Sequence, residues 1–136
     1  MSPIPQDPET AFIEELLSRY DQTGPGWLLS ASDIERWIEI VGSTKRHAYD
    51  VIARHLAVGF HEGRFPFWFC DSVVNAVVGF AYDDCLQNGE DLPALFYEVY
   101  LAFDAGEVGR AGMDPIEIHT RPMIAEIIRD PAHDAG

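Results

Sequence analysis

The stretch from residue 66 to residue 86 constrains the fold of this chain more than any other. Its apolar residues come in adjacent pairs, which are Val73-Val74, Val77-Val78 and Phe80-Ala81. The first two pairs stand four positions apart, a spacing that fits a helix and not the strict alternation of a strand. Aromatic residues precede them, so the segment is apolar on nearly all sides, and such a helix lies inside a protein with others packed around it. We therefore predict a central apolar helix over about residues 66–86.

Helix start and stop signals recur along the rest of the chain. Asp7-Pro8 is typical of a helix start, because Asp is a favoured N-cap and Pro fits the first helical position. Residues 32–35 have the pattern of a capping box, and Ser43 or Thr44 is expected to cap the helix that follows. The predicted helices cover about 8–21, 33–41, 44–61 and 66–86, then a segment from near Asp91 to Gly106, a short turn at Asp114-Pro115 and a last helix after Thr120-Arg121-Pro122.

No stretch of the sequence predicts a strand with confidence. The expected fold is therefore all-α, with five or six helices and short connections. The chain of 136 residues is long enough for one domain with a real core and too short for two ordinary ones. We predict a single domain over residues 1–136, with loose ends at 1–6 and 131–136.

The charge of the chain is strongly negative and unevenly distributed. The net charge is −14, and residues 67–118 contain ten acidic residues and one basic residue. Such a field repels nucleic acid and anionic membranes, and it favours either a basic partner or simple solubility. We predict one acidic and aromatic face that binds a basic protein partner, formed by Asp83, Asp84, Glu90, Asp91, Tyr97, Glu98, Tyr100, Asp104 and Glu107. The alternative is a face that only solvates the protein.

The cysteines, the first ten residues and the interrupted apolar run lead us to expect a cytoplasmic protein that does not span a membrane. Cys70 and Cys85 would lie roughly 22 Å apart on one helix, which is too far for a disulfide, so both are expected to be reduced. The first ten residues have neither a charged nor an apolar signal region. The apolar run of residues 65–82 approaches the length of a membrane span, but polar residues at 71, 72 and 75 interrupt it.

Asp71 and Asn75 form the most informative polar pair. They are four residues apart and share one face of the predicted central helix, and Gly79 would continue that face and let another backbone come close. We predict that both are buried and structural, with Asp71 paired to Arg46, Arg54 or Arg64 and its pKa lowered. The alternative is an acid in a pocket, with a raised pKa.

Catalytic, metal and cofactor motifs are missing from the sequence. His55 and His61 are six residues apart, whereas zinc ligands on one helix need a separation of four. Cys70 has no adjacent base and is expected to be a buried, inert thiol. The glycines of residues 106–112 are followed by no Lys-Ser or Lys-Thr pair, so they do not predict a phosphate loop. We expect no enzyme activity, metal or cofactor.

The run from Leu95 to Glu107, followed by Asp114-Pro115 and Thr120-Arg121-Pro122, resembles small acidic bacterial immunity proteins. Proteins of this kind accompany secreted toxins and neutralise them by binding. The resemblance covers about the last third of the chain. It implies a toxin as the partner but identifies neither a particular toxin nor any site residue.

These observations leave one leading hypothesis and three alternatives. The leading hypothesis is an immunity or antitoxin-type inhibitor whose acidic face docks on a basic toxin. A phage-type inhibitor that mimics nucleic acid would instead space its carboxylates as phosphates are spaced. A small ligand-binding or enzymatic domain would have a concave pocket beside Asp71, Asn75 and Tyr82. A self-associating module would need a basic counterpart to its acidic face.

Overall fold

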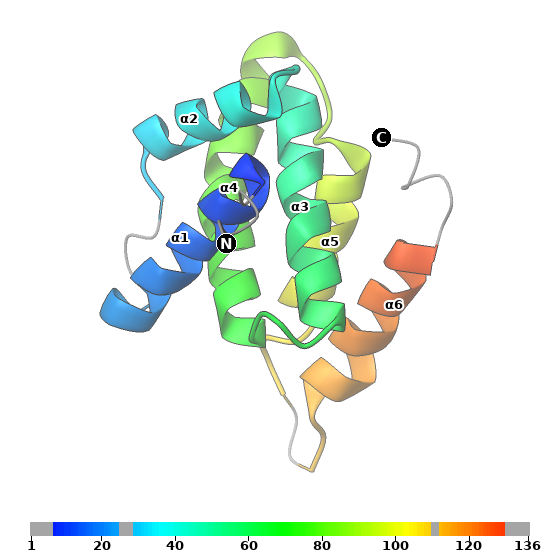
Figure 1. Cartoon of the computed structure of the whole chain (residues 1–136). Helices are drawn as coiled ribbons and strands as arrows, with labels where there is room; N and C mark the ends of the chain where they lie inside the picture. Colours follow the sequence, from blue (N-terminus) through cyan, green and yellow to red (C-terminus); the bar gives the residue numbers. More distant parts are fainter. Residues whose placement is uncertain (1–6, 25–28, 110–111, 130–136) are drawn as a thin grey trace, which may run out of the picture.

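The structure, a computed structural model, describes residues 7–24, 29–109 and 112–129. In these residues it contains helices and no strand, which confirms the predicted all-α class (Figure 1). The predicted loose ends at 1–6 and 131–136 lie outside the described residues. The elements in chain order are α1 (Pro8–Thr23), α2 (Ala31–Val41), α3 (Lys45–His61), α4 (Phe67–Asn88), α5 (Ala94–Asp104), the π-helical turn η1 (Ile116–Thr120) and α6 (Arg121–Arg129).

The apolar helix α4 lies at the centre of the bundle, as predicted, and shares this position with α3. Helix α3 packs against α2, α4, α5 and α6, and α4 packs against α3 and α5. Figure 1 shows α1 and α2 on one side of this central pair, with α5 and α6 on the other. The chain reverses direction between α4 and α5, so the start of α4 meets the end of α5, with the rings of Phe67 and Phe103 5.9 Å apart.

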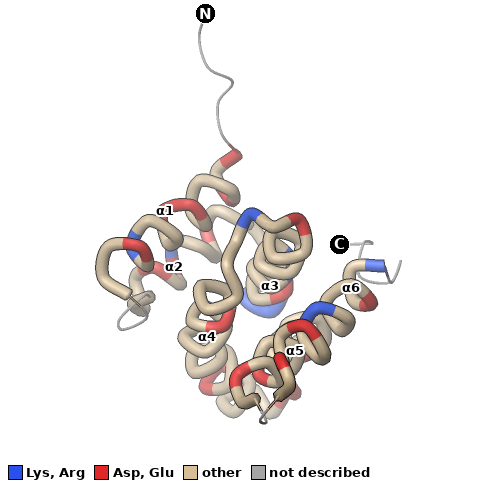
Figure 2. Tube along the Cα trace, turned by 90° about the horizontal axis from the view of Figure 1, so that it is seen from below, with Lys and Arg blue, Asp and Glu red and all other residues tan. Residues whose placement is uncertain are grey.

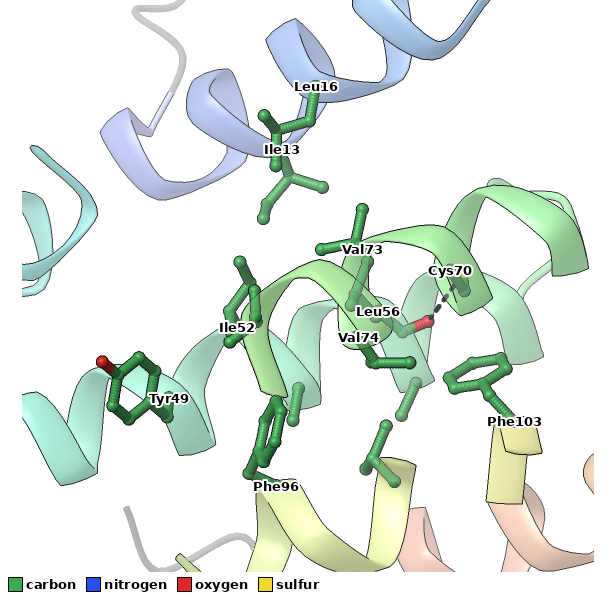
Figure 3. Close-up of a cluster of buried hydrophobic side chains, with 14 of the residues drawn as sticks. Ile13, Leu16, Tyr49, Ile52, Leu56, Cys70, Val73, Val74, Phe96 and Phe103 are labelled. Atoms are coloured by element: carbon green, nitrogen blue, oxygen red, sulfur yellow. Dashed lines mark hydrogen bonds between the residues drawn. The ribbon is translucent and has the colours of Figure 1, made fainter. Parts of the chain in front are cut away.

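The core is built where these helices meet. All six α-helices contribute to it, and Figure 3 shows the part where side chains of α1, α3, α4 and α5 converge. The thiol of Cys70 is buried there and donates to the carbonyl of Leu56, with 3.7 Å between Sγ and O. Burial raises the pKa of this thiol, so Cys70 is an inert core residue, as predicted. Fully buried side chains of the core include Ile13, Leu16, Ile52, Leu56, Val73, Val74, Phe96 and Phe103.

The predicted caps are partly confirmed. Asp7 and Thr44 cap α1 and α3 with their side chains. The capping box of α2, however, begins at Ser30 and not at Ser32, so the helix starts two residues earlier than predicted. The reason is tertiary, because Arg19 of α1 donates to Asp33 at 2.9 Å and holds that carboxylate where it also accepts the Ser30 N–H.

The start of α5 also differs from the prediction. Asp91 does not cap this helix; the N-cap position is Pro93, which has no side-chain cap. Asp50 of α3 supplies the missing acceptor, because its Oδ1 receives the backbone N–H of Phe96 at 2.9 Å. The cap therefore comes from a neighbouring helix, which no local sequence pattern announces.

One face of α4 remains at the surface. Trp68, Tyr82 and Leu86 are half or more exposed although the segment reads as apolar on nearly all sides. Gly79 lies on this open face, and a Cβ added there would meet no atom within 4 Å. The expectation that Gly79 admits a neighbouring backbone is therefore wrong. Among the described residues, no helix combines the length and the apolar character that a membrane span requires.

Candidate partner-binding site

Exposed apolar and acidic side chains lie along the line where α4 and α5 meet. We call this line the α4–α5 seam. In Figure 2 acidic positions recur along both of these helices. The seam is formed by Asp71, Asn75, Tyr82 and Leu86 of α4, by Tyr97, Tyr100 and Asp104 of α5, and by Glu107 just after α5.

At one end of the seam lies an apolar hollow of about 650 Å³. Tyr82 and Leu86 of α4 face Tyr97 of α5 across it, and they are 54%, 63% and 46% exposed. Two carboxylates stand at its rim, Glu90 and Asp91. Exposed tyrosines beside an apolar hollow are the side chains that most often anchor a protein partner. The full lining is Tyr82, Cys85, Leu86, Glu90, Asp91, Leu92, Ala94 and Tyr97.

The helical repeat explains which predicted residues the seam brings together. Consecutive residues of a helix are rotated by about 100°, so Tyr97, Tyr100 and Asp104 lie along one edge of α5. Glu98 is about 100° away from Tyr97 and lies toward the other edge of the helix. The helical repeat therefore separates Glu98 from the two tyrosines and places Asp104 with them, and the role of all four residues in binding stays a prediction.

At the other end of the seam, Asp71 lies against acidic side chains. It is buried, with 6% of its surface exposed, and its Oδ1 has no hydrogen-bond partner among the described residues. Burial first, and then Glu107 and Asp104, raise the pKa of Asp71 to about 8. Asn75 is exposed, not buried as predicted, and its Nδ2 donates to Glu107 Oε2 at 3.0 Å.

Among the described residues, none of the three predicted partners of Asp71, Arg46, Arg54 and Arg64, forms an ion pair with it. Arg46 donates to the carbonyl of Asp91 at 2.6 Å, at the opposite end of the seam. Arg64 pairs with Glu62 at 2.9 Å, just after α3. In the described part of the chain Asp71 makes no ion pair, so the predicted lowering of its pKa is wrong and the alternative, a raised pKa, agrees with the structure. Sequence spacing along α4 gave no sign of Glu107, which lies 36 residues further on.

Tyr100 lies on α5 between Tyr97, which lines the apolar hollow, and Asp104 at the acidic end of the seam. Burial raises the pKa of its hydroxyl first, and Asp104, Glu107 and Asp71 raise it further. Tyr97, which lines the hollow, acts on Tyr100 as well. Asp104, Glu107 and Asp71 are therefore the carboxyl groups that act on the hydroxyl of Tyr100.

Basic residues of α3 neutralise part of the predicted acidic face. Lys45 lies 3.6 Å from Asp84, and Arg46 lies 3.6 Å from Glu90. Asp84 also accepts the hydroxyl hydrogen of Tyr49, and burial together with this bond raises the pKa of the tyrosine. Asp83 stays exposed and lines a shallow hollow around Gly79. The acidic residues of the predicted face therefore differ in how available they are to a partner, and Asp84 chiefly makes contacts within the chain, with Lys45 and Tyr49.

A second hollow, of about 500 Å³, lies between α1 and α3 and is more basic. His47, Arg54, His55 and Arg64 line it, and His55 Nε2 lies 2.8 Å from Glu9 Oε1. In the described ranges, no three His, Cys, Asp or Glu side chains are grouped as a metal site requires.

The predicted resemblance to immunity proteins rests on residues 95–122. It remains a prediction, and the function of the chain is argued below from the geometry of the seam. A comparison of the chain with protein-family models, with curated proteins and with solved structures found no match.

Proposed function

We propose that this chain is a non-enzymatic binding protein that docks its α4–α5 seam on a basic protein, as an immunity or antitoxin-type inhibitor does. The observation that carries this proposal is the apolar hollow between Tyr82, Leu86 and Tyr97, with Glu90 and Asp91 at its rim. A single exposed apolar side chain is normal on a protein surface. Three around one hollow, next to carboxylates, are typical of a site that anchors a partner.

The two kinds of side chain would have different roles in the complex. The tyrosines and Leu86 would lose their contact with water and hold the partner, so they should determine the rate of dissociation. The carboxylates, together with a net charge of −14, would attract a basic partner and raise the rate of association, an effect that salt screens.

The test is affinity capture from a lysate of the native host at low and at moderate salt, followed by mass spectrometry. Three baits are needed: the wild type, the seam variant Tyr82→Ser/Tyr97→Ser, and the control Met113→Ser/Ile118→Ser. The control removes side chains that are 48% and 44% exposed and that do not line the apolar hollow. A basic protein retained at moderate salt by the wild type and the control, but lost by the seam variant, supports the proposal. Equal retention by all three baits contradicts it.

The same capture separates the toxin inhibitor from the mimic of nucleic acid. A mimic would occupy the nucleic-acid site of its target, so excess duplex DNA or RNA would release the captured protein. A toxin inhibitor that binds beside the active site would stay bound in the presence of nucleic acid.

The raised pKa of Asp71 favours a second candidate, a small ligand-binding or enzymatic domain. A pocket acid must reach its ligand, however, and Asp71 lines neither the apolar hollow nor the hollow between α1 and α3. A screen of small ligands by NMR tests this candidate, since a ligand that shifts the signals of Asp71 and Asn75 together would favour it.

A further inference from the structure

We propose that Asp71 and Glu107 share one proton and form a clasp that holds the segment after α5 against α4 and opens when the pH rises. The inference goes beyond the proposed function and does not depend on it, because it concerns two carboxyl groups within the chain.

The first observation is the environment of Asp71. Its Oδ1 is buried and receives no N–H or O–H donor from the described residues. A buried carboxylate oxygen without a donor is strongly unfavourable. A protonated carboxyl group is itself a donor, so one proton on either Asp71 or Glu107 supplies the bond that is missing.

The second observation is the position of Glu107. Helix α5 ends at Asp104, and the N–H of Glu107 bonds to the carbonyl of that residue at 3.1 Å. Between them the chain passes through Gly106, where a Cβ would come within 2.3 Å of Thr120 Oγ1 and 2.9 Å of the Phe67 ring. The backbone is therefore tightly enclosed just before Glu107, and Asn75 of α4 holds the Glu107 side chain at 3.0 Å.

The third observation is the charge around the pair. From α4 the titratable neighbour is Cys70, from α5 they are Tyr100 and Asp104, and all of these are neutral or negative. Among the described residues, neither α3 nor α6 places a lysine, arginine or histidine in an ion pair with Asp71 or Glu107. Because no ion pair with a basic residue is found among the described residues, a retained proton is the means by which the pair reduces its repulsion.

The raised pKa of Asp71, about 8, places the loss of the shared proton, and with it the opening of the clasp, in an accessible range of pH. Below this pH, one carboxyl donates to the other and the clasp is closed. Above it, the proton goes to solvent and leaves two carboxylates side by side, so Glu107 should swing outward and the acidic end of the seam should gain a negative charge.

The test is a titration of the full chain from pH 5 to pH 10, followed by the side-chain carboxyl carbon signals in NMR. The variants are Asp71→Asn and Glu107→Gln, and Asp104→Asn is the matched control, which removes a nearby acid that does not form the clasp. In the wild type the carboxyl signal of Asp71 should titrate near pH 8. In the control, which loses one of the acids that raise this pKa, it should titrate somewhat lower but still well above pH 4. In Asp71→Asn this titration should disappear. If both carboxyls titrate near pH 4, where ordinary side chains do, the proton is not shared and the proposal is wrong.

The backbone provides an independent readout. The amide signals of Gly106 and Val108 should shift with the same midpoint as the carboxyl signal in the wild type and should not follow it in Asp71→Asn. A carboxyl that titrates near pH 8 while these amides stay unchanged would show that the proton is shared but holds nothing in place, which overturns the clasp. Asn is close to Asp in size and can donate to Glu107, so Asp71→Asn should remain folded and closed at high pH.

Discussion

Gly59 and Gly79, which both lie inside helices, should respond in opposite ways to substitution by alanine. Gly59 belongs to α3 and Gly79 to α4. Alanine is favoured over glycine in a helix interior by about 0.8–1.0 kcal/mol. On helix propensity alone, both substitutions would therefore stabilise the protein by the same amount.

The surroundings of the two positions separate them. A Cβ on Gly79 meets no atom within 4 Å, so Gly79→Ala should gain the full propensity term of about 1 kcal/mol. A Cβ on Gly59 would lie 2.1 Å from Cδ2 of Phe65, whose buried ring is 5.4 Å from that of Phe69. Overpacking of this kind costs about 1–3 kcal/mol, and the propensity term is common to both positions, so Gly59→Ala should be less stable than Gly79→Ala by about 1–3 kcal/mol.

Urea unfolding followed by far-UV circular dichroism measures both free energies of unfolding. The substitution Phe65→Leu provides the matched background, because it removes the ring atoms that the new Cβ would strike. Gly59→Ala should cost less in this background than in the wild type, which a double-mutant cycle quantifies. If Gly59→Ala stabilises the wild type as much as Gly79→Ala does, then Phe65 does not cover Gly59 and the packing after α3 is not as described.

Three further predictions follow from the contacts of single carboxylates. Asp50→Ala removes the acceptor of the Phe96 N–H and should destabilise the protein by about 1 kcal/mol in the same urea assay; an unchanged midpoint would contradict the cap. The Arg19 guanidinium lowers the pKa of Asp33 from 3.8 to about 2. The ionised carboxylate therefore adds about 2 kcal/mol to the free energy of unfolding above pH 4, and this contribution is lost as the pH falls through 2. The difference in stability between the wild type and Asp33→Asn should close over this range of pH. Asp104→Lys should slow association with the captured basic partner about tenfold and Glu98→Lys much less, as stopped-flow rates at low salt would show; equal effects would remove the seam from the interface.

The helices of this fold were predictable because their signals are local. The apolar pairs of residues 73–78 and the caps at Asp7 and Thr44 each involve residues within one or two turns of each other. The exact start of α2 was not predictable, since Ser30 and Ser32 both fit the pattern. The choice depends on Arg19, which reaches Asp33 from another helix at 2.9 Å.

The site was less predictable than the fold, for the same reason. The sequence identified Asp71 as an unusual acid, but its neighbour Glu107 comes from beyond the end of α5 and is brought close only by the packing of α5 on α4. Similarly, the sum of charges over residues 67–118 does not reveal that Lys45 of α3 lies beside Asp84. Leu86 follows Tyr82 by four positions, so the helical repeat could have placed both on one open face.

The charge of the chain would be explained by solubility alone if the acidic residues stood by themselves. Solubility requires carboxylates at the surface, but it gives no reason for exposing Tyr82, Leu86 and Tyr97 around one hollow, because exposed apolar surface works against solubility. Nor does solubility require Asp104, at the acidic end of the seam, to lie close to Tyr100 on the same edge of α5. A partner that is both basic and apolar accounts for the two features together. For this reason the position of the acidic residues next to the hollow, and not their number, is the stronger argument for a binding function.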